Sequence, residues 1–168
     1  MEIISRTTAV ALLIILSPFL VFIGLGNLII QGRPIIYRQK RVGKNFQEFM
    51  IYKFRTLKNE EAGLDNFSSG KVVKLTKWGR FLRKTKLDEL PQLVNIIKGD
   101  MRFIGPRPEI PNYVSPDSFA FLNVIKPGLS GFSSILFRNE SEIWSMIEAD
   151  DPYKDILKIK VGLANYYV

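Results

Sequence analysis

The sequence predicts a small α/β domain, mostly α-helical, that is attached to a membrane by its first residues. Three patterns lead to this fold class: a long apolar segment at residues 9–30, two short strands after it, and amphipathic helices further along the chain. We expect residues 1–32 to form the membrane helix and residues 33–168 to form one domain at the cytoplasmic face. A chain of 168 residues, 46% of them hydrophobic, is long enough to bury a core of its own.

The composition narrows the chemistry that the chain can carry. It has no Cys and no His, so it lacks a disulfide framework and the usual thiol and imidazole groups of active sites. If the protein is an enzyme, carboxylates are the leading candidates for its chemistry, followed by Lys and Tyr. The net charge of +8 predicts a polyanionic partner, either nucleic acid, anionic lipid or a phosphorylated substrate.

The apolar segment matches the thickness of a membrane, but its middle is interrupted. At about 1.5 Å per residue, residues 9–30 can cross a hydrocarbon core of about 30 Å. Pro18, directly after Ser17, removes a backbone donor and predicts a break in the helix there. Arg6 and Arg33 flank the two ends, and positive flanks tend to stay cytoplasmic, which favours a re-entrant helix. An ordinary kinked spanning helix and a cleaved signal peptide are the alternatives.

A hairpin and a basic helix are predicted next. Residues 35–37 and 46–52 have strand character, with a turn at residues 42–45 between them. Basic residues then recur at every third position through residues 71–83, with apolar residues between them, which predicts a basic amphipathic helix. Such a helix suits an anionic membrane surface, and a solvated face on a core-packed helix or nucleic-acid binding are the other interpretations.

An acidic pair, Asp88 and Glu89, opens the next predicted helix. Thr85 and Asp88 have the spacing of a capping box, Gly99 suits the position after the helix, and four residues follow its apolar period: Leu90, Leu93, Val94 and Ile97. Acidic residues in a first turn are often purely structural, because they complement the helix dipole. The same position is expected to lower the carboxylate pKa, which keeps the group ionised and able to act as a nucleophile or metal ligand.

Guanidinium groups follow the acidic pair closely. Arg102 comes first, and Arg107 stands between two prolines that restrict its backbone. A preorganised arginine fork suits phosphate and a carboxylate pair suits a metal ion, so this region predicts a site for both, with a proline-rich surface turn as the alternative. A membrane-anchored nucleic-acid binder does not explain the acidic pair, so no nucleic-acid partner is expected. The proline-rich second half predicts loops and short helices, including one at residues 141–149.

At these residues the chain resembles the bacterial sugar transferases, the monotopic phosphoglycosyl transferases, over nearly all of its length. The motifs that carry the resemblance occur in the family's order: Leu16-Ser17-Pro18, Tyr37-Arg38-Gln39, Arg41-Val42-Gly43, Lys53-Phe54-Arg55-Thr56, Leu82-Arg83-Lys84-Thr85, Leu87-Asp88-Glu89-Leu90-Pro91-Gln92, Gly99-Asp100-Met101, Gly105-Pro106-Arg107-Pro108-Glu109 and Lys126-Pro127-Gly128-Leu129-Ser130-Gly131.

The resemblance implies a reaction. A sugar-1-phosphate is moved from a UDP-sugar to undecaprenyl phosphate with release of UMP, which begins a surface glycan such as an exopolysaccharide or O-antigen. Asp88 is implied to be the catalytic nucleophile, which carries a covalent phospho-sugar, and Glu89 to be a catalytic group; both are expected to bind Mg²⁺. The expected phosphate and substrate contacts are Lys53, Arg55, Arg83, Gln92 and Arg107.

The resemblance also implies a location: a monotopic protein on the cytoplasmic face of the bacterial inner membrane, with the helix broken at Ser17-Pro18. An anionic membrane surface is an expected partner, and a homodimer is left open. Ser134 and Phe137 stand where the family often has Gln and Gly, which affects substrate recognition more than chemistry. The chain ends where members usually continue, so we expect a minimal catalytic form, short or truncated. A non-catalytic membrane scaffold is the competing hypothesis, although an inactive relative should have lost Asp88, Glu89 or Arg107.

Overall fold

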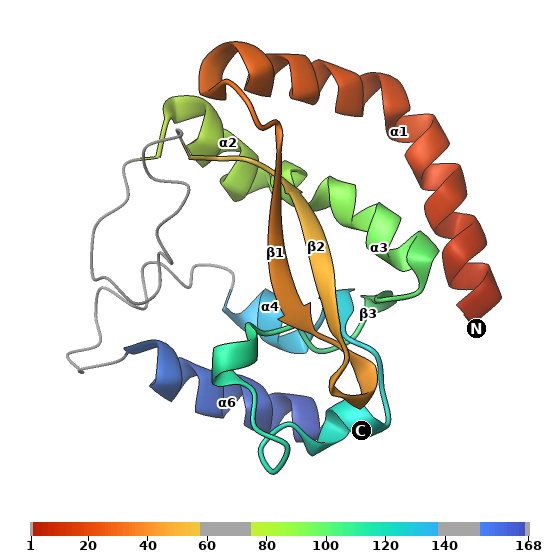
Figure 1. Ribbon diagram of the computed structural model, residues 1–168, viewed down its shortest axis with the longest axis vertical. Coiled ribbons are helices and arrows are strands. Elements are labelled where there is room, and N and C mark those ends of the chain that lie inside the picture. The colour runs from red at the N-terminus through yellow and green to blue at the C-terminus, as the bar shows by residue number, and fades with distance from the viewer. Residues whose placement is uncertain (1, 58–74, 138–151, 167–168) are drawn as a thin grey trace. The chain divides into compact units, whose positions relative to one another are not determined.

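A computed structural model describes residues 2–57, 75–137 and 152–166. It is mostly helical and contains a two-stranded hairpin, as predicted (Figure 1). The chain divides into two compact units: residues 3–39 and 51–97 form the first unit, and residues 40–50 and 98–168 belong to the second. The predicted helix at residues 141–149 lies outside the described residues.

The N-terminal apolar segment forms one helix, α1, from Glu2 to Gln31 with Pro18 inside it. Figure 1 shows that α1 is bent rather than straight. Because Pro18 has no N–H, the carbonyl four residues earlier, that of Ile14, loses its helical donor. The Ser17 hydroxyl replaces this donor with a 2.7 Å hydrogen bond to the Ile14 oxygen. The Ser17-Pro18 pair therefore bends the helix without leaving a carbonyl unsatisfied.

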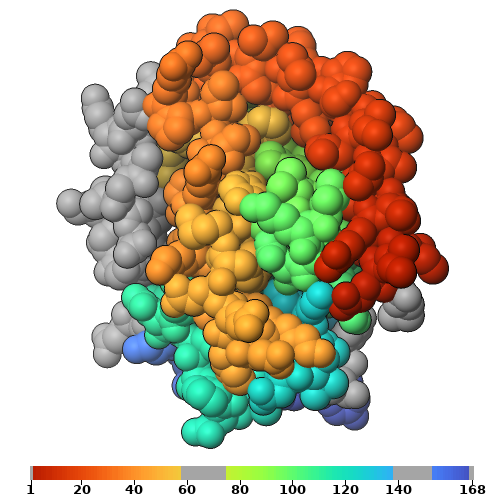
Figure 2. Space-filling model, turned by 45° about the vertical axis from the view of Figure 1, so that its right-hand side comes forward, coloured from red at the N-terminus to blue at the C-terminus, as the bar shows by residue number. Residues whose placement is uncertain are grey.

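Most of the apolar surface of α1 is not covered by protein. By length and composition the helix can cross a membrane, and only 11% of its most apolar stretch is buried. Ile14 and Phe22 are 67% and 65% exposed, and the space-filling view shows α1 at the molecular surface (Figure 2). Water does not favour an uncovered stripe of this kind, whereas lipid does.

The hairpin consists of β1, Ile36–Val42, and β2, Glu48–Phe54, which are hydrogen-bonded neighbours. β1 is longer than the sequence predicted, whereas β2 has the predicted length but begins two residues later, and the connection is a 3₁₀-turn, η1, at Lys44–Phe46. Asn45 has φ 55°, a left-handed conformation that Asn tolerates better than most residues. Three helices follow in the first unit: α2 at Lys77–Thr85, the 3₁₀-helix η3 at Leu87–Gln92, and α3 at Leu93–Lys98.

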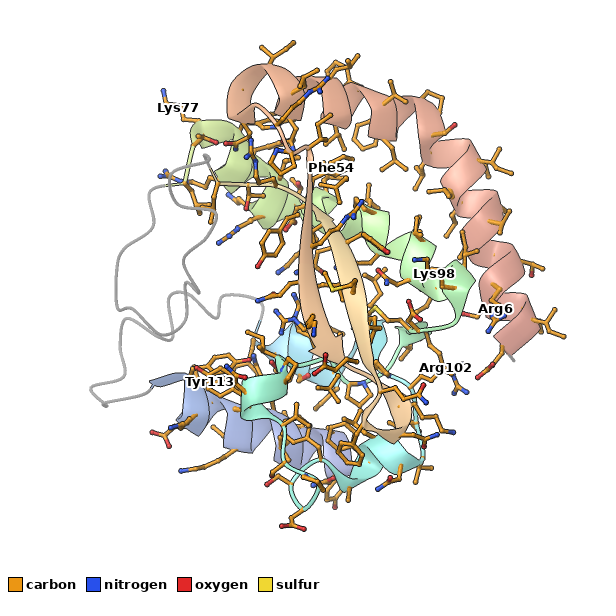
Figure 3. All side chains as sticks on the ribbon, in the orientation of Figure 1. Arg6, Phe54, Lys77, Lys98, Arg102 and Tyr113 are labelled. Atoms are coloured by element: carbon orange, nitrogen blue, oxygen red, sulfur yellow. The ribbon has the colours of Figure 1, made fainter. Side chains whose placement is uncertain are left out.

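The core of the first unit joins α1 to β2 and α2. Ile23 from α1, Phe54 from β2 and Leu82 from α2 are buried together, and Trp78 and Leu20 pack against them. Figure 3 shows Phe54 at the end of β2, close to α1. One side of the apolar helix is therefore a core element of the first unit, and its other side is uncovered.

The predicted start of the basic helix lies too early in the sequence. α2 begins at Lys77 instead of near residue 71, because the Thr76 hydroxyl caps it by accepting a 2.9 Å hydrogen bond from the Gly79 N–H. Lys71 and Lys74 lie outside the described residues. The prediction that Gly99 follows the end of the next helix is confirmed, since Gly99 has φ +87° directly after α3.

The second unit contains a small parallel sheet that the sequence analysis did not predict. In it β3, Arg102–Ile104, pairs with β4, Gly128–Ser130. The hydrophobic core of the second unit includes Phe119, Phe121, Leu122, Tyr153 and Leu157, and further apolar residues pack around them. The remaining elements of this unit are η4 at Pro111–Tyr113, η5 at Ala120–Asn123, α4 at Phe132–Leu136 and α6 at Pro152–Tyr166.

Candidate active site

The acidic pair lies in the first turn of the 3₁₀-helix η3, which continues directly into α3, so the prediction that the pair opens a helix is confirmed, although that first part is a 3₁₀-helix. Lys86, with φ 59°, ends α2 in a left-handed conformation and starts η3. The expected capping box is absent from η3, because the Thr85 hydroxyl donates backwards to the carbonyls of Phe81 and Leu82 at 2.8 and 3.2 Å. The side chain of Thr85 therefore belongs to α2, and tertiary packing holds the acidic pair.

Asp88 is buried, being 7% exposed. Burial raises the pKa of its carboxyl, while Lys53 lowers this pKa, Glu89 raises it, and Arg83 lowers it. The prediction that a helix dipole would depress this pKa was therefore wrong, since loss of water is the largest effect. One carboxylate oxygen, Oδ1, is buried without a hydrogen-bond partner among the described residues. An uncompensated carboxylate oxygen is costly unless a ligand completes it.

Glu89 is held by a cation from the neighbouring strand. Its Oε1 lies 2.9 Å from the Lys53 ammonium, and the two side chains are only 10% and 16% exposed. Lys53 comes from β2 and Glu89 from η3, so the ion pair joins two elements of the first unit. The structure thus brings Lys53, Asp88 and Glu89 into one cluster, as the sequence predicted.

Two further predicted residues belong to this cluster. Arg83, on α2, is near enough for its charge to affect the Asp88 carboxyl, and its Nε donates a 3.0 Å hydrogen bond to the Thr56 hydroxyl. Gln92, at the end of η3, is 3% exposed, and its Nε2 has no hydrogen-bond partner in the described parts of the chain. A buried amide donor without a partner is suited to accept a ligand oxygen.

Arg55 occupies a different environment from the one predicted. It is 2% exposed, and its guanidinium donates to the carbonyl oxygens of Gln31 and, at 2.9 Å, Arg33. These carbonyls lie at the end of α1, where helical partners are lacking. Arg55 therefore caps α1 in this structure, and its contact with a substrate phosphate stays a prediction.

Arg107 belongs to the second unit, where its segment is fixed on both sides. Before it, the Gly105 N–H donates to Ser130 at 3.0 Å, and the Pro106 oxygen accepts from the Gly128 N–H at 2.8 Å. After it, the buried Arg41 donates to the Pro108 carbonyl at 3.2 Å. A Cβ on Gly128 would lie 2.1 Å from the Gly105 nitrogen, so the two family motifs meet through glycine backbone.

Asp88 and Glu89 are suited to bind a magnesium ion, the cofactor that the resemblance implies. Among the described residues no three or more acidic side chains gather in one place. Mg²⁺ does not need such a set, because it commonly uses one or two carboxylates together with waters and substrate phosphates. The uncompensated oxygen of Asp88 beside Glu89 supplies that donor set.

Several polar residues that support this site were not identified from the sequence. Asn27 is completely buried; it donates to the Arg55 carbonyl at 2.9 Å and accepts from the Trp78 indole at 2.8 Å. Gln31 donates to the Thr56 oxygen at 3.2 Å. Asn27 and Gln31 were the signal that could have revealed these contacts, since amides are costly in an apolar helix unless they are paired.

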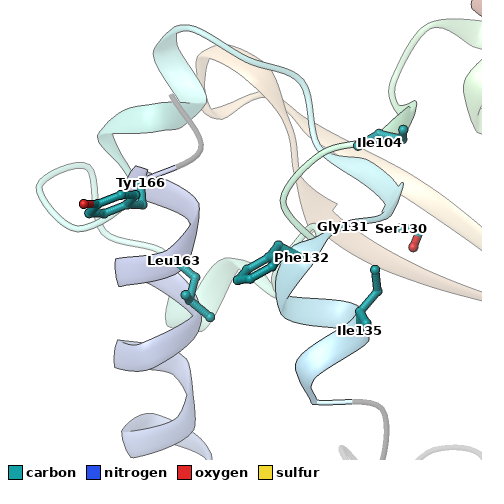
Figure 4. Close-up of a pocket in the computed structure, with 7 residues that line it drawn as sticks. All are labelled: Ile104, Ser130, Gly131, Phe132, Ile135, Leu163 and Tyr166. Atoms are coloured by element: carbon teal, nitrogen blue, oxygen red, sulfur yellow. The ribbon is translucent and has the colours of Figure 1, made fainter.

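A cavity in the second unit contains none of the predicted site residues. It has a volume of about 450 Å³ and is lined by Ile104, Ser130, Gly131, Phe132, Ile135, Leu163 and Tyr166 (Figure 4). Among the described residues, its lining is almost entirely apolar and includes no charged group. The cavity therefore does not share the chemistry of the acidic cluster.

Comparison with known proteins identifies the family. The family model described as bacterial sugar transferase matches residues 1–164. The chain belongs to the bacterial sugar transferase family. The match covers both units, and it confirms the resemblance that the motifs indicated.

Individual relatives are between 33% and 38% identical to this chain over the residues that align. The uncharacterized sugar transferase EpsL of Bacillus subtilis is 38% identical over 126 residues, which cover 74% of this chain and 62% of EpsL. The UDP-N-acetylgalactosamine-undecaprenyl-phosphate N-acetylgalactosaminephosphotransferase of Aeromonas hydrophila is 33% identical over 80% of this chain and 31% of its own length. The exopolysaccharide production protein ExoY of Sinorhizobium fredii is 36% identical over 86% of this chain and 72% of its own. The chain thus spans less than two thirds of the first two relatives.

Proposed function

We propose that the protein transfers a sugar-1-phosphate from a UDP-sugar to undecaprenyl phosphate and releases UMP. The observation that carries this proposal is the buried carboxylate of Asp88, with one uncompensated oxygen, among Lys53, Glu89 and Arg83. A nucleophile, a candidate metal ligand and cations occur together there, which is what transfer of a charged phosphoryl group requires. The name of the Aeromonas relative, which includes undecaprenyl phosphate and a UDP-sugar, agrees with this assignment.

The reaction proceeds in two displacements. An oxygen of the Asp88 carboxylate attacks the β-phosphorus of the UDP-sugar, and the bond from this phosphorus to the bridging oxygen breaks. UMP leaves with the electron pair, and the sugar phosphate stays on Asp88 as an acyl phosphate. A phosphate oxygen of the lipid then attacks the same phosphorus, the bond to Asp88 breaks, and the carboxylate is restored. Two bulky anions thereby use one site in turn.

The surrounding residues have separate tasks. Asp88 and Glu89 would hold Mg²⁺, which would supply positive charge to offset the negative charge of the phosphate groups. Lys53 orients Glu89 through their 2.9 Å ion pair. Arg83 and Gln92 donate hydrogen bonds to phosphate oxygens, whereas Arg55 and Arg107 stay sequence-based predictions of phosphate contacts.

The membrane arrangement follows from α1 and α2. We place α1 in the bilayer as a re-entrant helix bent at Ser17-Pro18, so that the protein is monotopic on the cytoplasmic face of the bacterial inner membrane. The uncovered apolar side chains of α1 support a lipid environment. On α2, Lys77, Arg80 and Lys84 are exposed together with Phe81, which is 48% exposed, and this composition suits an anionic lipid surface.

UMP release tests the proposed reaction. The chain is incubated with Mg²⁺, undecaprenyl phosphate and each member of a panel of UDP-sugars, and wild type is compared with Asp88→Asn. We expect release with at least one sugar, Mg²⁺ dependence, and no turnover by Asp88→Asn, because the amide cannot act as the nucleophile. Asp155→Asn makes the same chemical change at an exposed position on α6 and serves as the matched control.

The outcomes separate the hypotheses. Mass spectrometry of wild type after incubation with the active UDP-sugar alone should show the added sugar phosphate on Asp88. Turnover that persists in Asp88→Asn would remove Asp88 as the nucleophile. Absence of UMP with every sugar, from a folded and membrane-bound protein, would instead support the scaffold hypothesis.

A further inference from the structure

Thr56 lies where three elements of the first unit meet. It directly follows the end of β2 and Arg55, and it is 6% exposed. Its carbonyl oxygen accepts a 3.2 Å hydrogen bond from the Gln31 side chain of α1. Its hydroxyl accepts a 3.0 Å hydrogen bond from Nε of Arg83 on α2. One small residue thus contacts both the end of the membrane helix and a candidate phosphate contact.

The position of α2 relative to Thr56 is fixed by a glycine. Gly79 is buried on α2, and a Cβ built there would lie 2.1 Å from the Thr56 oxygen, so no other residue permits this approach. Arg83 is four residues further along the helix and therefore lies on the same face as Gly79. The close contact at Gly79 places the Arg83 side chain over the Thr56 hydroxyl.

A second contact holds the start of α2. The Gln31 amide donates at 2.7 Å to the hydroxyl of Thr76, and the same hydroxyl caps α2 by accepting from the Gly79 N–H. Gln31 therefore contacts both Thr56 and the N-cap of the helix that carries Arg83. The last turn of α1 fixes both partners of the Thr56–Arg83 hydrogen bond.

This hydrogen bond restrains an otherwise flexible side chain. An arginine has many rotamers, and a bond at Nε orients the plane of the guanidinium. It uses one of the five N–H donors and leaves the four on the terminal nitrogens for a ligand. The Arg83 residue as a whole is exposed, so the hydrogen bond at Nε restricts rotamers that the side chain could otherwise adopt.

We propose that Thr56 is a positioning residue: its hydroxyl fixes the Arg83 guanidinium so that the terminal nitrogens face the diphosphate of the sugar nucleotide. The inference rests on the proposed function, because it assigns Arg83 a phosphate of the UDP-sugar. Thr56 itself does not touch the substrate. Through Gln31 the same residue makes the last turn of the membrane helix part of the support of the site.

The test replaces only the hydroxyl. Thr56→Val keeps the shape of the side chain and removes the acceptor, whereas Thr56→Ser keeps the acceptor and removes the methyl group. We expect Thr56→Val to lower kcat/KM for the UDP-sugar by about ten- to hundredfold, the equivalent of one hydrogen bond to a charged group. Thr56→Ser should restore most of the loss. Equal kcat/KM for wild type and Thr56→Val would overturn the proposal.

A double-mutant cycle separates positioning from general packing. Arg83→Lys keeps the charge but has no Nε–H donor, so Thr56→Val should cost nothing further in the Arg83→Lys background. If the two losses multiply, Thr56 does not act through Arg83 and the proposal is wrong. Thr56→Ala replaces Thr56→Val in the same cycle if the valine variant does not fold, as judged by its thermal midpoint.

A binding measurement keeps this inference distinct from the proposed function. Isothermal titration with UDP and Mg²⁺ should show weaker binding by Thr56→Val and Arg83→Lys, to the same extent in the single and double variants. If wild type releases no UMP from any UDP-sugar, the proposed function fails. If wild type is active but UDP affinity and kcat/KM are unchanged in Thr56→Val, the function stands and the assignment of Thr56 fails.

Discussion

The ammonium of Lys53 and the carboxylate of Glu89 form a 2.9 Å ion pair that is nearly closed to solvent, with the two side chains 16% and 10% exposed. The pair joins β2 to η3 and therefore fixes the strand against the segment that carries Asp88. Removing one partner of such a pair leaves an isolated charge in a site with little water. The pair is thus part of the fold as well as of the candidate site.

Lys53→Met should destabilise the protein as well as inactivate it. The variant leaves the Glu89 carboxylate buried without its cation, at a cost of about 3 kcal/mol in the free energy of unfolding. The thermal midpoint in detergent measures this effect. Lys40→Met breaks the exposed 3.0 Å pair with Glu48 and should cost less than about 1 kcal/mol. Equal losses in the two variants would contradict the structural role of the buried pair.

The rate of the first displacement should fall with acid at a higher pH than an ordinary aspartate would give. Only the deprotonated Asp88 can attack, and burial raises the pKa of this carboxyl. As pH falls through the raised pKa, the carboxylate is protonated and kcat/KM for the UDP-sugar declines. The pH–rate profile measures this limb. More Mg²⁺ should move it to lower pH, since a bound cation favours the ionised form, and an Mg²⁺-independent limb would argue against Asp88 as a ligand.

Gly79→Ala should be strongly destabilising. The added Cβ would lie 2.1 Å from the Thr56 oxygen, so α2 must move away from the loop that it contacts. Gly162→Ala is the matched control, because Gly162 lies inside α6 with nothing within 4 Å of the added atom. There the change should stabilise the protein by about 0.5–1 kcal/mol. Thermal unfolding measures the stability of both variants. An unchanged thermal midpoint in Gly79→Ala would contradict the close approach of α2 to Thr56.

Pro18→Ala should change how α1 lies in the membrane. Alanine restores the N–H that the Ile14 carbonyl lacks, so the bend loses its cause and the helix can straighten into a spanning one. The chain has no cysteine, so a single Ile3→Cys can be labelled without background. In the Ile3→Cys protein the label should enter from the cytoplasmic side, as it should at Tyr166→Cys.

In the Pro18→Ala background, the Ile3→Cys site should become accessible from the opposite side of the membrane. Labelling of intact and permeabilised cells with a membrane-impermeant maleimide measures the change. Labelling of the unaltered helix only from the opposite side would exclude the re-entrant arrangement.

The parts of the fold that were predictable depend on local patterns. The apolar segment that became α1 and the hairpin strands were recognisable because each is defined by the period of its own residues. The small sheet of β3 and β4 was missed because its strands have only three residues each, too few to show a period. Its pairing depends instead on the backbone contact between Gly105 and Gly128.

For the candidate site, the residues that lie together were easier to predict than their burial and their pKa values. Asp88, Glu89 and Lys53 were identified from sequence and lie together, but the pKa of Asp88 was predicted in the wrong direction. Its shift comes from burial by distant parts of the chain, which no local spacing reveals. Arg55 shows the same limit, because only the fold places its guanidinium against the carbonyls that end α1.

The buried amides of α1 decide how a water-soluble form of this protein can be made. Deleting residues 1–32 would remove Asn27 and Gln31 from Trp78 and Thr56, take a carbonyl partner from Arg55, and uncover Phe54. Helix α1 therefore cannot be removed without opening the core of the first unit. A soluble form should instead keep α1 and replace exposed apolar residues of this helix by polar ones. The candidates are Ile14, Ile15, Phe22 and Ile29, and the buried residues of α1 stay unchanged.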